Sequence, residues 1–139
     1  MRRRLIVFSA LALGLLVAAG PLVAHHGFFG VLDLTGPILF EGVVTNVKWT
    51  NPHIVFNLDV RDQDGKVTNW RFEGAGPGAL KLRGWDRTDL RIGDRITVEG
   101  YRAKDGSFVA GAAAVMLANG RTLDASSDGV PSFGIHQGK

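Results

Sequence analysis

The fold is decided by residues 53–73, "HIVFNLDVRDQDGKVTNWRFE". Over 53–60 apolar and polar residues alternate, and one face carries Ile54, Phe56, Leu58 and Val60. Asp64-Gly65 is a dipeptide that tight hairpin turns prefer. Residues 66–73 then return with Trp70 and Phe72 on the apolar side. The stretch therefore predicts two antiparallel strands that bury one face.

Further strands are predicted on both sides of this hairpin. Residues 38–50, "ILFEGVVTNVKWT", are rich in β-branched and aromatic side chains and alternate over Val43, Thr45, Val47 and Trp49. "RITVEGYRA" (95–103) and "SFVAGAAAVMLANG" (107–120) are predicted as the last two strands, joined by a "KDG" turn.

One short helix is predicted in residues 74–85, "GAGPGALKLRGW". Pro77 suits a first helical position, and Gly84 is placed to end the helix. The element order β-β-β-α-β-β predicts an all-β domain with one short helix, a five-stranded OB-like barrel.

The two ends of the chain differ in character from the predicted barrel. "MRRR" followed by an apolar run predicts a secretory signal peptide over 1–24. We assign 25–37 to an N-terminal segment, 38–124 to the barrel and 125–139 to a flexible tail, because residues from 121 on have no apolar period. The protein is then periplasmic. The alternative is a retained anchor in the inner membrane facing the periplasm, since 5–24 is as long as a spanning helix.

The net charge argues against nucleic acid as a partner. The chain has 16 basic and 13 acidic residues, a net charge of +3. Arg2, Arg3 and Arg4 belong to the predicted signal, so the mature chain has 13 of each and is neutral. Binding to phosphates requires a clustered positive face, which this composition does not supply. There is no cysteine, so no disulfide framework can form.

Histidines are the candidate metal ligands. Cleavage after Ala24 makes His25 the first residue, whose α-amine and ring nitrogen can chelate one ion, with His26 beside it. Cleavage after Val23 instead makes His26 the third residue, which suits the amino-terminal chelate for Cu(II) or Ni(II). His53 is the predicted third imidazole, and a nitrogen ligand set of this kind favours Cu(II).

Other side chains suggest a ligand face without metal. Trp49, Asn51 and Tyr101 are candidates, because OB barrels bind ligands on one face. Glu73 and Glu99 are expected to be single carboxylates that point outward or lie at the rim, and no nucleophile motif is present. Three hypotheses follow: a copper-binding module, a metal-independent barrel that binds a ligand or an unknown periplasmic partner, and, least favoured, an oxidative copper enzyme.

Several runs in this chain resemble a family of small exported proteins of Gram-negative bacteria, classed as a domain of unknown function. The resemblance rests on "AHHGF", on "GVVTNVKWTNPHIVFNLDV" with its W-T-N-P-H run, and on "LRIGDRITVEGYRAKDGS". It covers nearly all of residues 24–120. It implies a periplasmic OB-like barrel and no established activity.

Overall fold

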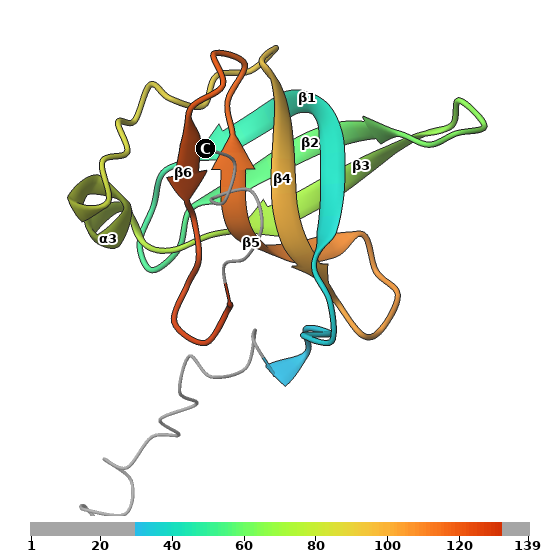
Figure 1. Cartoon of the computed structure of the whole chain (residues 1–139), viewed down its shortest axis with the longest axis horizontal. Helices are drawn as coiled ribbons and strands as arrows, with labels where there is room; N and C mark the ends of the chain where they lie inside the picture. The colour runs from blue at the N-terminus through green and yellow to red at the C-terminus, as the bar shows by residue number, and fades with distance from the viewer. Residues whose placement is uncertain (1–29, 132–139) are drawn as a thin grey trace, which may run out of the picture.

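The computed structural model describes residues 30–131 (Figure 1). The predicted signal peptide, His25, His26 and the last part of the predicted tail lie outside the described residues. The elements are β1 (Ile38–Lys48), β2 (Val55–Arg61), β3 (Val67–Glu73), α3 (Pro77–Leu82), β4 (Arg95–Arg102), β5 (Val109–Met116) and β6 (Thr122–Asp124). Among residues 30–131, no helix is both long and apolar enough to cross a membrane.

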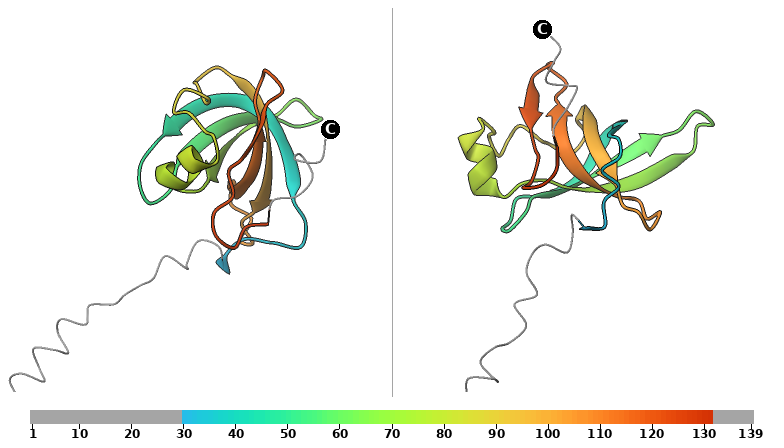
Figure 2. Two further views of the ribbon diagram at one scale, coloured as in Figure 1. Left: turned by 60° about the vertical axis from the view of Figure 1, so that its left-hand side comes forward. Right: turned by 60° about the horizontal axis from the view of Figure 1, so that its bottom comes forward.

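The strands form one sheet that closes on itself. Their order is β3-β2-β1-β4-β5-β6, and β3 also pairs with β5 in parallel, from Arg71 opposite Val109 to Glu73 opposite Gly111. This additional pairing closes a five-stranded barrel, which the two views of Figure 2 show from the side and from one end. The predicted fold, a mostly β domain with one short helix between the third and fourth strands, is confirmed.

The β2–β3 hairpin supplies much of the core, as its alternation predicts. Phe56, Leu58 and Phe72 are fully buried, and Trp70 is nearly so. The Phe56 and Phe72 rings stack with centroids 5.3 Å apart, and Phe40 of β1 meets Phe72 edge-on at 5.1 Å. Burial of large rings dominates the stability of a small domain without disulfides.

The inward face of β1 differs from the predicted alternation. A bulge between Val44 and Asn46 shifts the register against β2. Val44 is buried, whereas Val43 and Thr45, predicted to share a face with Val47 and Trp49, are only partly buried. The extra residue of a bulge reverses which side chains point inward on its two sides, so the period-2 pattern of residues 38–50 breaks at this point.

A second, smaller apolar cluster lies outside the barrel, against β4 and β5. It consists of Leu32, Tyr101, Ala113 and Val130. Leu32 is tied to the end of β4 by a bridge to Ala103. A Cβ on Gly111 would lie 2.5 Å from Leu32 Cδ1, so the glycine makes room for this side chain.

The residues expected to form a tail are partly integrated into the fold. Thr122–Asp124, at the end of the predicted barrel, pairs with β5 as β6; of the predicted tail, Ala125 is fully buried and Val130 packs in the outer cluster. The Ala125 carbonyl accepts a hydrogen bond from the Ala75 amide at 2.8 Å. This packing could not be predicted from the sequence pattern, because single small residues and backbone hydrogen bonds between distant parts of the chain produce it.

The short helix lies at the end of the barrel where β1 ends and β2 begins (Figures 1 and 2). Pro77 is at its start, as predicted, and Leu80 is its buried residue. The chain then turns at Gly84, whose φ of 88° suits glycine. Trp85 follows, with its Nε1 donating to the Asp124 carbonyl at 2.7 Å. The helix thereby closes this end of the core.

Candidate functional site

The loop between β1 and β2 carries the one predicted metal ligand that the structure describes. His53 lies in this loop, partly buried, and its Nδ1 is 3.0 Å from the Gly74 carbonyl oxygen. A carbonyl oxygen can only accept, so this contact places the ring proton on Nδ1. A contact of one ring nitrogen with a backbone carbonyl is the second contact typical of a metal-ligating histidine.

The loop is held in place by the backbone around the start of α3. Ile54, next to His53, makes two backbone hydrogen bonds to the segment before α3. Its amide donates to the Ala75 carbonyl, and its carbonyl accepts from the Gly74 amide, both at 3.1 Å. A Cβ on Gly76 would lie 2.5 Å from the Pro52 carbonyl oxygen. The close approach at Gly76 therefore fixes the position from which His53 projects.

The other two predicted ligands, His25 and His26, lie outside the described residues. Within residues 30–131, no group of three His, Cys, Asp or Glu side chains lies close enough to hold a metal ion. The described N-terminal segment is fixed to the barrel at Leu32. His26 precedes Leu32 by six residues, which span at most about 20 Å.

The predicted ligand face of Trp49, Asn51 and Tyr101 is divided by the fold. Asn51 is exposed, and Trp49 is half-buried and meets Trp85 edge-on with ring centroids 6.1 Å apart. Tyr101 differs from the expectation: it is 1% exposed, in the outer cluster under Leu32 and Val130. Tyr101 therefore belongs to the packing of β4 and does not line an exposed ligand surface.

Glu99, expected to be an outward carboxylate, is buried at 2% exposure beside Tyr101. Leu32, before β1, and Val130, after β6, pack with the neighbouring Tyr101, which the sequence pattern did not show. Burial, and secondarily the charge of Glu99, raises the pKa of the Tyr101 hydroxyl.

A row of polar side chains that the sequence reasoning missed crosses the outer face of β1, β2 and β3. Asn46 Nδ2 donates to Asn57 Oδ1 at 3.3 Å, and Asn57 Nδ2 donates to Asn69 Oδ1 at 2.9 Å. Asn69 Nδ2 in turn donates to Thr45 Oγ1 and to Asp59 Oδ1, at 3.0 and 2.7 Å. We call these five residues the amide row. The signal was present in the sequence as asparagines at outward positions of the alternating strands.

A groove adjoins the amide row at Asp59. It has a volume of about 410 Å³ and is lined by Glu41, Gly42, Val43, Asp59, Arg61, Val67 and Arg95. Its two acidic and two basic side chains balance, and both arginines are engaged: Arg95 pairs with Glu41 at 3.3 Å, and Arg61 donates to the Gly65 carbonyl at 2.7 Å. A neutral, polar surface of this kind does not suit a polyanion.

The closed five-stranded sheet, with a helix between its third and fourth strands, defines a small OB-like β-barrel. The chain belongs to a family of unknown function (DUF6152), whose model matches residues 12–112. Neither the curated proteins nor the solved structures contain a match. The family membership agrees with the resemblance seen in the sequence, and it assigns no activity.

Proposed function

We propose that this protein is an exported, periplasmic binding module that holds Cu(II) through His25, His26 and His53. The observation that supports this proposal is the His53 contact. Its Nδ1 donates to the Gly74 carbonyl at 3.0 Å, and a hydrogen bond of this kind orients the ring of a metal-ligating histidine. The α-amine and ring of His25, or the chelate centred on His26, supply the remaining nitrogen ligands.

The fold limits how the ligands meet. The chain between His26 and Leu32 is short, and the 125–130 segment links the surroundings of Leu32 to those of the β1–β2 loop. That segment contacts both sides: Ala125 bonds to Ala75 beside Gly74, and Val130 packs with Leu32. The copper ion then lies at the end of the barrel that carries the β1–β2 loop.

Copper binding is tested on protein expressed with its own signal and purified from the periplasm. Isothermal titration with Cu(II), in glycine as a weak competing chelator, is expected to give about one ion per chain. His53→Ala is expected to weaken binding at least about tenfold, because even loss of a group that only orients a ligand weakens metal sites by about 10- to 100-fold. Electron paramagnetic resonance should lose one nitrogen coupling in this variant.

His136→Ala is the matched control, since it removes an imidazole outside the proposed set. It is expected to leave affinity and spectrum unchanged. Equal affinity of the wild-type and His53→Ala proteins would contradict the role of His53, and binding no tighter than that of a scrambled histidine-containing peptide would contradict the copper function altogether.

A second candidate function is favoured by the amide row and its groove. OB barrels bind ligands on the outer face of their second and third strands, where this row lies. Because its side chains bond to one another, the row is preorganised, and its neutral lining suits a hydroxyl-rich ligand such as a glycan. The barrel would then act without metal.

The two functions are separated by one pair of variants. Asn57→Leu removes the centre of the amide row, and His53→Ala leaves it intact. In the second function, glycan binding on an array survives chelator treatment and His53→Ala but is lost in Asn57→Leu. An array with no bound glycan for wild-type protein would refute it.

A further inference from the structure

A cavity lined by the packed indoles of Trp49 and Trp85, at the helix end of the barrel, has no role in the functions proposed above. It has a volume of about 300 Å³ and is lined by Trp49, Pro77, Lys81, Trp85, Asp86 and Arg87. This volume is within the range of small-molecule sites. The aromatic and proline side chains form an apolar wall. The charged lining residues come from α3, which carries Lys81, and from the loop that follows it, which carries Asp86 and Arg87.

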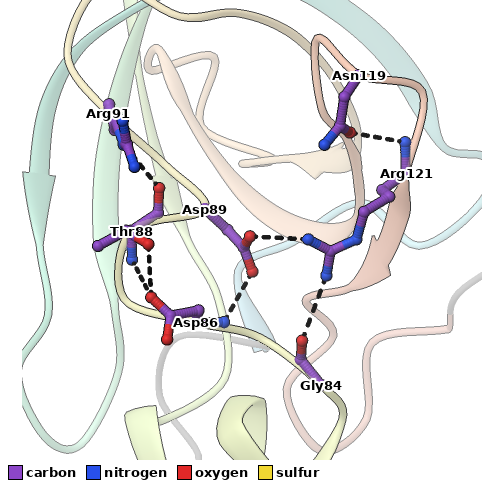
Figure 3. A network of polar contacts seen from close by, with 7 residues as sticks. All are labelled: Gly84, Asp86, Thr88, Asp89, Arg91, Asn119 and Arg121. Atoms are coloured by element: carbon purple, nitrogen blue, oxygen red, sulfur yellow. Dashed lines mark hydrogen bonds and ion pairs between the residues drawn. The ribbon is translucent and has the colours of Figure 1, made fainter.

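The wall that carries Trp85, Asp86 and Arg87 is fixed by a network of polar contacts (Figure 3). Arg121 Nη1 pairs with Asp89 Oδ1 at 3.0 Å, and Asp89 Oδ2 accepts from the Asp86 amide at 2.7 Å. Arg121 Nη2 also donates to the Gly84 carbonyl at 3.4 Å. The cavity wall is therefore preorganised, which lowers the conformational entropy that the protein loses on binding a ligand.

The cations around this network fall into two groups. Arg83, Arg91 and Arg121 each donate hydrogen bonds to neighbouring oxygens. Lys81 and Arg87, which line the cavity, make no hydrogen bond or ion pair within residues 30–131. Neither cation is held by a direct bond there, although the charge of Lys81 helps to lower the pKa of the Asp86 carboxyl.

Asp86, the one acidic residue of the lining, is already engaged. Its Oδ1 accepts from the Thr88 amide at 2.8 Å and from Thr88 Oγ1 at 2.6 Å, and these bonds lower the pKa of its carboxyl. Two available cations against one engaged carboxylate leave the cavity with an excess of positive charge.

Trp49 contributes a further sign of an absent partner. Its Nε1 is buried and has no hydrogen-bond partner in the described part of the chain, whereas Trp85 Nε1 is satisfied by the Asp124 carbonyl. A buried donor without an acceptor is unfavourable.

We propose that this cavity binds a small organic anion: a carboxylate on an aromatic or apolar ring, with the ring against Trp49 and Trp85 and the carboxylate at Lys81 and Arg87. The site is separate from the copper ligands and from the amide row. Its ligand enters the cavity from the solvent side, where Lys81, Asp86 and Arg87 are exposed.

A series of indoles that share one ring and differ in charge tests the proposal. Titration calorimetry on the full mature protein is expected to give the highest affinity for indole-3-acetate and the lowest for cationic tryptamine. Neutral indole-3-acetamide should bind about tenfold more weakly than indole-3-acetate, because it loses a charge-assisted hydrogen bond. No variant is needed for this comparison, so it does not depend on the folding of a mutant.

Substitutions then locate the site. Lys81→Ala and Arg87→Ala are each expected to weaken indole-3-acetate about tenfold. Asp86→Asn should strengthen it, and Lys66→Ala, an exposed lysine at the β2–β3 turn, should leave it unchanged. Tryptamine binding as tightly as indole-3-acetate, no binding of any probe at millimolar concentration, or full affinity in the Lys81→Ala/Arg87→Ala double variant would overturn the proposal.

Discussion

Gly76 is the position at which one added methyl group should move the candidate copper site. The residue is the N-cap of α3, with φ of −68° and ψ of 153°, which alanine adopts as readily as glycine. A Cβ there would lie 2.5 Å from the Pro52 carbonyl oxygen. The effect of Gly76→Ala is therefore steric, and it acts on the loop that carries His53.

The size of the effect follows from this geometry. Ordinary contact begins at 3.4 Å, so the loop must retreat by 3.4 − 2.5 = 0.9 Å, and the atom that must move belongs to backbone. Overpacking of this kind destabilises by about 1–3 kcal/mol. In a domain of this size, that lowers the Tm by about 4–12 °C.

Gly78→Ala, two residues further on, is the matched control. A Cβ at Gly78 meets nothing within 4 Å. The same substitution there should stabilise the protein by about 0.4–1 kcal/mol, because alanine restricts the unfolded chain.

Thermal unfolding followed by circular dichroism, with urea unfolding at 25 °C, measures both changes. Copper titration of the two variants should show weaker binding for Gly76→Ala only. A Gly76→Ala protein as stable as wild type, or a Gly78→Ala protein destabilised to the same degree, would refute the argument from close approach.

Two further predictions concern the outer cluster. Leu32→Ala should lower the free energy of unfolding by about 2–5 kcal/mol, because Leu32 is buried. The control, Leu34→Ala at an exposed position, should change it by less than about 0.5 kcal/mol. Equal urea midpoints for the two variants would contradict the role of Leu32 as an anchor. The raised pKa of Tyr101 means that its neutral form is favoured in the folded state, so its contribution is present below pH 10 and is lost as pH rises through the folded pKa. Tyr101→Phe should therefore flatten the fall in stability above pH 10, and an unchanged slope would show that Tyr101 does not cause it.

Most strands of the barrel could be predicted from the sequence because their signals are local. Alternation over residues 53–60 and the Asp64-Gly65 turn are set by side chains that are neighbours in the chain. The bulge in β1 was not predictable in this way. It depends on how one long strand pairs with β2 on one side and β4 on the other, which is a property of the closed sheet.

The candidate sites show the same contrast between local sequence signals and contacts between distant residues. His53 was a candidate because it follows Pro52 at the start of the second predicted strand, on its outward face, which is a local signal; its contact with Gly74 joins residues 21 positions apart. The burial of Tyr101 and Glu99 depends on the chain segments that cover β4 from both ends of the domain. The Trp49–Trp85 cavity likewise forms only when the helix reaches the end of the barrel.

Native mass spectrometry of the periplasmic protein with one equivalent of Cu(II) tests the central proposal most directly, because one spectrum reports both the mature N-terminus and the bound metal. We predict the mass of a chain that begins at His25, or at Ala24 after the alternative cleavage, plus one copper ion, and loss of that ion in His53→Ala. A chain that still begins at Met1, or a mature chain that carries no copper, would contradict the account.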